Sequence, residues 1–302
     1  MNRVLIIKLG ALGDFIQALG PMAAVRRHHP GAHLALLTTA PFRDFAAASP
    51  WFDEVLVDGR PGLADLGGLL RLRGLLRGFG RIYDLQTSDR SSWYFQLAGR
   101  LPEWSGIARG ASHPHREPER DRMHTMDRQR DQLAECGIVE VRPPDLSWAT
   151  ADVSMFGLAE RYALLVPGAA PHRPAKRWPI ENFAAIARRL AAETIRPVIV
   201  GGPGDRAHGA RITAELPAAL DLTGRTSLLQ LASLGRSAVA AIGNDTGPMH
   251  LLAGIGTPLT VLYSRESDPD LTAPRGPSVN ILKADSLADL PVRAVAEALR
   301  LR

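Results

Sequence analysis

The chain alternates short apolar runs with longer amphipathic stretches. Apolar runs of four to six residues predict buried parallel strands, and apolar positions at helical spacing, such as those within Glu181–Ala192, predict the helices between them. In the first half, strands are expected at Arg3–Lys8, Leu34–Thr38, Glu54–Val57, Arg81–Leu85 and Gly106–Arg109. A single helix is expected from about residue 14 to 27, after the first strand.

Pro143 and Pro144, with the polar residues after them, predict a linker, after which the alternation begins again. Strands are expected at Tyr162–Val166, Pro197–Gly202, Leu220–Leu222, Ser237–Ile242, Leu259–Tyr263 and Val279–Leu282, and a final helix at about Leu287–Leu301. Two successive runs of βα units predict two Rossmann-like, doubly wound α/β domains, residues 1–150 and 151–302, that face a cleft.

Composition excludes several classes of protein. With 302 residues, 45% hydrophobic and 22% charged, the chain has enough apolar residues for two globular cores and too few charges for a disordered protein. The N-terminus leads directly into a strand, which argues against a signal peptide, and no apolar run has the length of a membrane span. Cys136 is the single cysteine, which excludes an intrachain disulfide and fits a reducing cytoplasm.

Charge adds a weaker indication. The net charge of +5 favours an anionic partner, and the absence of a nucleic-acid motif argues against DNA or RNA. Arginines are spread along the apolar stretch Leu63–Leu76, which we interpret as an Arg-rich surface helix while leaving membrane contact open. The polar segment Gly110–Arg130 holds three histidines without a metal-ligand spacing and is expected to be a solvated loop.

The segment Gly243–His250 carries the strongest chemical signal. It joins an apolar strand to a helical stretch, so it lies at the carboxyl end of a strand, where open α/β sheets bind ligands. Pro248 suits a first helical turn, Asp245 or Thr246 can cap it, and the free N–H groups there favour a phosphate. His250 can add a donor to the same anion. The alternative is a well-capped helix with a structural histidine.

A second turn follows the first strand. Gly10 and Gly13 allow a tight turn and a close approach of a ligand, and Asp14 stands where the dinucleotide-binding fingerprint would have its third glycine. A carboxylate there disfavours pyrophosphate and can serve as a general base. The alternative is that Asp14 caps the helix.

Two further loops of the second half are candidates. The basic loop His172–Pro179 suits recognition of a diphosphate leaving group, with Lys176 as a point charge; the alternative is an ordinary solvated loop. The turn that contains Gly201 and Gly202 can shape a nucleotide pocket or serve only as a tight connection.

Three segments in this order, Lys8–Asp14, Pro174–Pro179 and Asn244–His250, resemble the ADP-heptose:lipopolysaccharide heptosyltransferase family. Leu222–Leu228 is similar to the segment that precedes the family's nucleotide turn. The resemblance spans nearly the whole chain and implies an inverting glycosyltransferase of the two-Rossmann GT-B type. It also implies that the final helix crosses back onto the first domain.

The resemblance also assigns roles to residues. It implies that Asp14 is the general base on the acceptor hydroxyl and that Lys176 stabilises the departing ADP. The residues that it places at the nucleotide diphosphate are Asp245, Thr246, Gly247 and His250. Arg90 and Arg109, together with Gly13, are candidates for the acceptor. The segment Ser264–Pro269 departs from the family's Gly-Pro-Thr-Asp-Pro-like turn, so the donor sugar is left as heptose or a related sugar.

The expected function is therefore transfer of a heptose, or a related sugar, from an ADP-sugar to a lipopolysaccharide inner-core or related cell-envelope acceptor. We expect a cytoplasmic protein with an anionic glycolipid or glycan acceptor and peripheral contact with the inner membrane. No metal or other cofactor is expected, because Lys176 and a helix N-terminus can neutralise the diphosphate. The alternatives are a sugar-nucleotide epimerase, a non-catalytic nucleotide-sugar-binding protein and, more remotely, a dinucleotide dehydrogenase.

Overall fold

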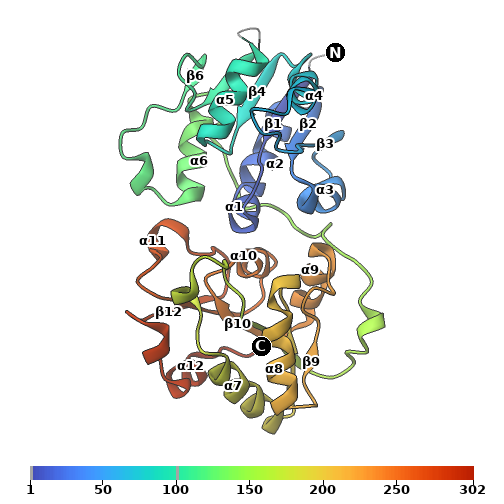
Figure 1. Ribbon diagram of the computed structural model, residues 1–302, viewed down its shortest axis with the longest axis vertical. Helices are drawn as coiled ribbons and strands as arrows, with labels where there is room; N and C mark the ends of the chain where they lie inside the picture. The colour runs from blue at the N-terminus through green and yellow to red at the C-terminus, as the bar shows by residue number, and fades with distance from the viewer. Residues whose placement is uncertain (1–2, 100–101) are drawn as a thin grey trace. The chain divides into compact units, whose positions relative to one another are not determined.

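The computed structural model describes residues 3–99 and 102–302 and divides after Trp148 into two compact units (Figure 1). The division lies two residues from the boundary expected from the sequence. Each unit holds one six-stranded parallel sheet. The two sheets have the same strand order relative to their first strand, which is that of the doubly wound Rossmann fold.

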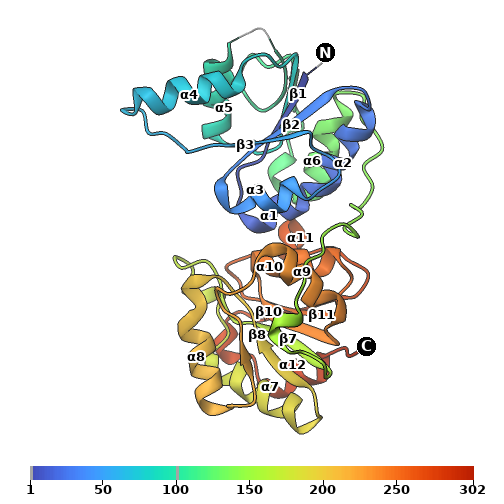
Figure 2. The ribbon, with the colours of Figure 1, turned by 90° about the vertical axis from the view of Figure 1, so that its right-hand side faces the viewer.

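The first sheet has the order β3-β2-β1-β4-β5-β6. Its strands are β1 (Arg3–Ile7), β2 (His33–Thr38), β3 (Glu54–Val57), β4 (Arg81–Asp84), β5 (Glu103–Gly106) and β6 (His113–Pro114). The helices are α1 (Leu12–Gln17), α2 (Leu19–His28), α3 (Ala40–Ala47), α4 (Leu66–Leu76), α5 (Asp89–Ala98) and α6 (Thr125–Ala134). Helix α6 packs against α1 and α2, whereas α4 packs against α5 (Figure 2).

The second sheet has the order β12-β11-β10-β7-β8-β9. Its strands are β7 (Tyr162–Val166), β8 (Arg196–Ile199), β9 (Leu220–Asp221), β10 (Ala240–Asn244), β11 (Leu259–Tyr263) and β12 (Val279–Lys283). The helices are α7 (Ile180–Ala192), α8 (Arg206–Glu215), α9 (Leu228–Ser237), α10 (Gly247–Gly254), α11 (Pro269–Thr272) and α12 (Val292–Ala298).

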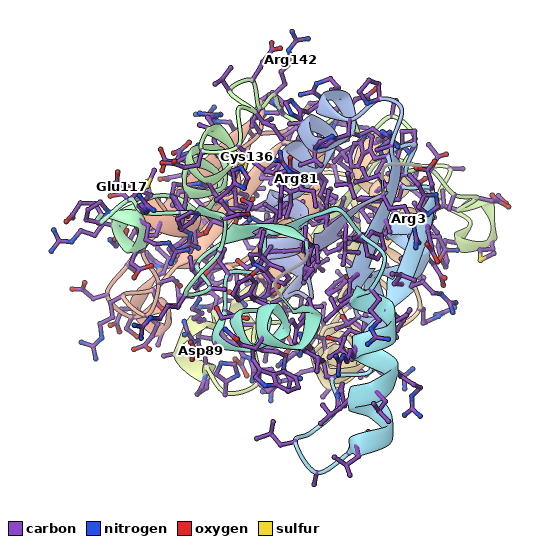
Figure 3. All side chains as sticks on the ribbon, turned by 90° about the horizontal axis from the view of Figure 1, so that it is seen from above. Arg3, Arg81, Asp89, Glu117, Cys136 and Arg142 are labelled. Atoms are coloured by element: carbon purple, nitrogen blue, oxygen red, sulfur yellow. The ribbon has the colours of Figure 1, made fainter. Side chains whose placement is uncertain are left out.

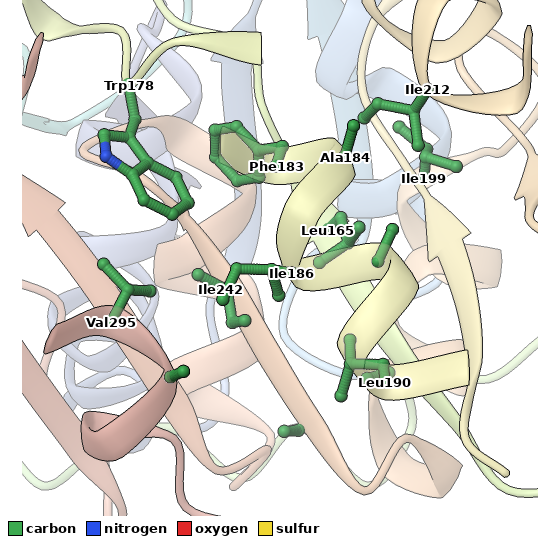
Figure 4. Packing of buried hydrophobic residues seen from close by; sticks show 14 of the residues in the cluster. Leu165, Trp178, Phe183, Ala184, Ile186, Leu190, Ile199, Ile212, Ile242 and Val295 are labelled. Carbon is green, nitrogen blue, oxygen red and sulfur yellow. The ribbon is translucent and has the colours of Figure 1, made fainter. Parts of the chain in front are cut away.

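The core of the second unit shows why the sequence forms these layers. Every residue of β7, β10 and β11 is buried, as expected for strands that are covered on both faces. On one face, Leu165 and Ile242 pack with Phe183 and Ile186 of α7 and with Val295 of α12 (Figure 4). Helices α9 and α10 pack against each other and supply further buried apolar side chains.

The sequence-based expectations were wrong at several element boundaries in the first unit. The single helix expected after β1 is divided at Ala18, which separates α1 from α2. The strand expected at Gly106–Arg109 is instead β5, which ends at Gly106, where the φ angle of +157° lies in a region open chiefly to glycine. Trp104 is fully buried within it.

In the second unit, two element boundaries also differ from those expected from the sequence. Helix α9 continues to Ser237, so β10 starts at Ala240 rather than at Ser237. The final helix is shorter than expected, because a 3₁₀ turn over Leu287–Asp289 precedes α12. Helix α12 packs on α7 and β12 of its own unit.

Among residues 3–99 and 102–302, no helix combines the length and the apolar character that a membrane span requires.

Candidate active site

The turn between β10 and α10 is the centre of the site in the second unit. Strand β10 ends at Asn244, and α10 begins at Gly247 with Thr246 as its N-cap residue and Pro248 in its first turn. The Thr246 side chain makes no capping hydrogen bond to this helix. In this turn Pro248 has no N–H and the Met249 N–H donates to the Thr246 carbonyl oxygen at 3.1 Å, so the turn offers an anion the Gly247 N–H and the positive end of the helix dipole.

Asn244 fixes the basic loop against this turn. Its side chain is fully buried, and its Oδ1 accepts a hydrogen bond of 3.0 Å from the Trp178 backbone N–H. Its Nδ2 donates to the carbonyl oxygen of Pro167 at 2.7 Å. The Trp178 indole is also buried and donates to the Leu290 carbonyl oxygen at 2.9 Å. The basic loop is therefore anchored at Trp178, near its carboxyl-terminal end, and the chain that leads into it is anchored at Pro167, which argues against the alternative of an ordinary solvated loop.

This anchoring brings Lys176 to Asp245. The Lys176 Nζ donates to Asp245 Oδ2 at 2.6 Å, and the Ser267 hydroxyl donates to the same oxygen at 2.7 Å. Both members of the ion pair are largely buried, with side chains 13% and 9% exposed. Burial raises the pKa of the Asp245 carboxyl, but the hydrogen bonds from Lys176 and Ser267 outweigh it and hold that pKa below its usual value.

The pairing changes the interpretation of Asp245. The resemblance placed Asp245 at the diphosphate, yet a carboxylate repels a diphosphate, and this one already accepts hydrogen bonds from two side chains. In the structure, the Asp245 carboxylate holds the Lys176 ammonium in position. His250, buried in the first turn of α10, is close enough that its charged form lowers the pKa of Asp245.

The turn containing Gly201 and Gly202 has a packing role in the structure. The Gly202 N–H donates to Asp205 Oδ2 at 2.8 Å. A Cβ atom at Gly201 would lie 2.6 Å from that oxygen, and one at Gly168 would lie 2.4 Å from Asp205 Oδ1, so both positions need the absence of a side chain. These contacts agree with the alternative in which the turn serves only as a tight connection between two elements.

In the first unit, Asp14 lies in the first turn of α1 as a partly exposed residue. The N-cap residue of α1 is Ala11, so the helix-cap alternative for Asp14 is wrong. Within the described part of the chain, the Asp14 carboxylate forms no hydrogen bond or ion pair. Gly10, with a φ angle of +120°, leaves room for the Phe42 ring, which a Cβ atom there would approach to 2.9 Å.

Asp14 lines a polar pocket of about 160 Å³. Its lining includes three cationic side chains, Lys8, Arg120 and Arg128, as well as Gln129. Arg120 Nη2 and Gln129 Oε1 are buried there with no hydrogen-bond partner among residues 3–99 and 102–302. A donor and an acceptor are thus both available to a bound molecule.

Two of these cations, Arg120 and Lys8, are held by neighbouring groups. Arg120 Nε donates to His115 Nδ1 at 3.4 Å, and His115 Nε2 in turn is 2.8 Å from Asp131 Oδ2. Lys8 Nζ donates to the Leu85 carbonyl oxygen at 3.0 Å. Burial lowers the pKa of the Lys8 ammonium to about 8, although the nearby carboxylates raise it. The segment expected to be a solvated loop therefore supplies part of the pocket.

Of the other acceptor candidates, one lies beside Asp14 and two are not among the residues that line its pocket. Gly13 adjoins Asp14 on α1. Arg90 lies on α5 and its Nη1 is 3.4 Å from the Tyr94 hydroxyl. Arg109 lines a different hollow, formed with Phe95 and other residues, and neither arginine is among the described residues around Asp14.

Comparison with known proteins decides the family. The model of "Glycosyltransferase family 9 (heptosyltransferase)" matches residues 71–295, well over half of the chain. The chain is a member of glycosyltransferase family 9. It is thus a glycosyltransferase, as the sequence motifs indicate. Among the described residues, no group of three or more His, Cys, Asp or Glu side chains is arranged to hold a metal ion.

Individual members of the family resemble the chain over nearly its full length. Lipopolysaccharide heptosyltransferase 2 of Salmonella typhimurium is 26% identical, over 93% of this chain and 88% of that protein. The structure of Escherichia coli ADP-heptose lps heptosyltransferase II has a TM-score of 0.80 at 24% identity, covering 99% and 97% of the two chains. The E. coli heptosyltransferase WaaC with ADP has a TM-score of 0.77 at 20% identity, with 98% of each covered.

The expected fold of two Rossmann-like, doubly wound domains is confirmed by these structures. The epimerase alternative has weaker support: the UDP-GlcNAc 2-epimerase of Methanocaldococcus jannaschii has a TM-score of 0.59 at 12% identity, which shows a shared fold alone.

The motif reasoning for this family 9 member missed several residues. Ser267 lies in the segment Ser264–Pro269 that departs from the family pattern, and only the folded chain shows that its hydroxyl reaches Asp245. Arg120 lies in a segment with no periodicity, and Arg128 lies in the first half of α6. The feature that marks this part of the site is a concentration of arginines near His115. That histidine is buried, and its burial could not be predicted from the sequence.

Proposed function

We propose that this protein transfers a heptose from ADP-heptose to a sugar hydroxyl of the lipopolysaccharide inner core, with inversion at the anomeric carbon. The observation that carries the proposal is the Lys176–Asp245 pair beside the open N-terminus of α10, a fixed cation next to a helix end that favours phosphate. The full-length similarity to a lipopolysaccharide heptosyltransferase supports the identity of donor and acceptor.

The donor's diphosphate binds in this proposal at the first turn of α10. The residues that contact it are Thr246, Gly247 and His250 together with the Lys176 ammonium. Asp245 contributes by holding Lys176 in position. Gly201 and Gly202 shape the neighbouring loop through their contact with Asp205 rather than through a side chain of their own.

The acceptor binds in the pocket around Asp14. Lys8, Arg120 and Arg128 give this pocket an excess of positive charge over Asp14 and Asp121, so it fits an acceptor sugar that bears an anionic group. Gly13, which adjoins Asp14 on α1, is assigned to the same acceptor subsite. Arg90 and Arg109, which the pocket lining does not include, are assigned at most an outer part of a larger acceptor.

The chemistry follows from these placements. Asp14 removes the proton of the acceptor hydroxyl, whose oxygen forms a bond to the anomeric carbon from the side opposite the diphosphate. The bond from that carbon to the phosphate oxygen breaks, and its electron pair leaves with ADP. Lys176 and the α10 N-terminus stabilise the charge that develops on the leaving diphosphate, which is the role that a divalent cation plays in other enzymes. We therefore expect transfer to proceed in EDTA.

The first test compares how strongly the protein binds different nucleotides. Thermal unfolding is measured with ADP, UDP, GDP and NAD at equal concentrations, because a ligand that binds only the folded state raises the thermal midpoint. The proposal predicts the largest rise with ADP. A preference for UDP or GDP would replace the donor, and stabilisation by NAD alone would overturn the proposal.

A transfer assay with ADP-heptose follows, with and without the acceptor. Heptose transfer that requires acceptor supports the proposal. Conversion of the donor's sugar in the absence of acceptor would favour the epimerase, and tight ADP binding without either reaction would favour a nucleotide-sugar-binding protein.

A glycolipid acceptor is reached at a membrane, so we place the reaction at the cytoplasmic face of the inner membrane.

A further inference from the structure

Helix α4 and the turn before it expose leucines that the rest of the protein leaves uncovered. Leu63, Leu66 and Leu70 are 77%, 72% and 70% exposed, which makes them three of the most exposed large apolar side chains described. Leu66 and Leu70 are four residues apart and thus lie on one face of α4. On the opposite face, Leu72 and Leu76 are buried in the first unit's core.

The same outer face is strongly basic. Arg71, Arg73 and Arg77 are exposed, and within residues 3–99 and 102–302 none of them forms an ion pair. Residues 66–77 contain no Asp or Glu, and the carboxylate just before them, Asp65, accepts the Gly68 N–H as the helix N-cap. We define Leu63, Leu66, Leu70, Arg71, Arg73 and Arg77 as the α4 surface.

The position of the helix leaves this surface accessible within its unit. Helix α4 packs against α5, and Figure 2 shows its ribbon extending outward from the sheet of the first unit. Figure 3 shows side chains projecting from the same helix. An uncovered leucine pair beside arginines is the pattern of a helix that lies in the interface of a bilayer, with its apolar side chains among the lipid tails and its cations at the head groups.

We propose that the α4 surface docks the protein on a membrane that carries anionic lipids. A second copy of the chain fits it less well, because symmetric contact would bring arginines of the two copies together. The docking agrees with the proposed function, which needs a glycolipid acceptor, and deepens it by naming the contact surface. Its test needs neither donor nor acceptor.

The experiment is flotation of the full-length protein with vesicles of phosphatidylglycerol and phosphatidylethanolamine, and with vesicles of phosphatidylcholine alone. Wild-type protein is expected to float with the anionic vesicles, less so as salt is raised, and at least tenfold less with phosphatidylcholine. The double variant Leu66→Gln/Leu70→Gln should bind the anionic vesicles at least tenfold more weakly. Arg71→Gln/Arg73→Gln/Arg77→Gln should lose the preference for anionic lipid.

Val139→Gln is the matched control, because Val139 is also 77% exposed but lies outside the α4 surface. It should bind vesicles as the wild type does. Circular dichroism should show all variants folded, since each changed side chain is exposed. Vesicle binding that is absent in the wild type, or unchanged in the leucine variant, would overturn the proposal.

Two further readouts separate this proposal from others. If sedimentation shows a wild-type dimer that Leu66→Gln/Leu70→Gln converts to monomer, the surface serves a second copy and membrane docking is overturned. Transfer to a water-soluble, delipidated acceptor should proceed at the wild-type rate in the leucine variant. Loss of that activity would likewise count against a docking role, whereas a wild type that binds vesicles but transfers no heptose would refute only the proposed function.

Discussion

The Lys176 ammonium and the Asp245 carboxylate lie 2.6 Å apart, although 69 residues separate them in the sequence. The pair joins the basic loop to the turn before α10, and Ser267 donates a second hydrogen bond to the same carboxylate oxygen. A lysine side chain has four rotatable bonds, so an unpaired one would sample many positions. Asp245 thus fixes the cation that we assign to the leaving diphosphate.

Replacing Asp245 by Asn removes the charge that holds Lys176 but keeps the size of the side chain. We expect kcat to fall about 10²-fold, because a small displacement of a group at the reacting bond has an effect of that order. ADP affinity should not weaken, since a negative charge has been removed from the vicinity of a polyanion. Steady-state kinetics and calorimetry measure the two effects, with exposed Asp270→Asn as control.

Weaker ADP binding by Asp245→Asn, with kcat preserved, would instead show that Asp245 contacts the nucleotide itself.

Arg120→Gln tests the acceptor pocket. A charge-assisted hydrogen bond to an anionic acceptor is worth about 1.5–3 kcal/mol, so its loss should raise the KM for acceptor about 10- to 100-fold. The donor KM should not change. Arg109→Gln is the comparison, because Arg109 lines a different hollow, and its acceptor KM should stay within about threefold of the wild type. The reverse ranking of the two variants would place the acceptor at Arg109.

Asn244→Ala tests the anchoring of the basic loop. The variant leaves the Trp178 N–H and the Pro167 carbonyl oxygen without their buried partner, which should lower the free energy of unfolding by about 2–3 kcal/mol. Asn280→Ala, which removes one partly buried hydrogen bond to the Ala298 carbonyl oxygen, should cost about 1 kcal/mol. Urea unfolding measures both. Equal losses in the two variants would argue against the anchoring role.

Lys8 gives a prediction about pH. Burial lowers its pKa from 10.5 to about 8 in the folded state, so between these values the unfolded chain binds more protons than the folded one. The free energy of unfolding should therefore rise with pH across that interval. Relative to Lys8→Met, the wild type should gain about 2 kcal/mol between pH 7 and pH 9.5. Parallel stability curves for the two proteins, measured by urea unfolding, would contradict the lowered pKa.

Periodicity and turn chemistry were sufficient to predict most strands of the two sheets, but not β6, which lies in the segment expected to be a solvated loop. Runs such as Tyr162–Val166 are buried on both faces and therefore apolar throughout, which makes them visible in the sequence. Boundaries that depend on neighbouring elements were not visible. Helix α9 continues through Ser237, and α12 packs on α7, because of tertiary contacts that local propensity does not contain.

The candidate site, too, could be predicted only in part from the sequence. Glycines, a proline and a histidine in a fixed order identified the turn before α10, because each is needed there for a local reason. The partner of Asp245 depends on how the chain folds over 69 residues, and so its role as the anchor of Lys176 could be found only in the structure. Arg120 was overlooked because its segment has no regular pattern.

The most direct test of the central claim is transfer by Asp14→Asn, which keeps the shape of the side chain but cannot accept the hydroxyl proton. The rate of heptose transfer is measured beside the rise in thermal midpoint that ADP causes. If Asp14 is the general base, kcat should fall about 10²- to 10⁴-fold, with the ADP-induced rise unchanged. Wild-type transfer rates in Asp14→Asn would contradict the assignment of Asp14 as the general base.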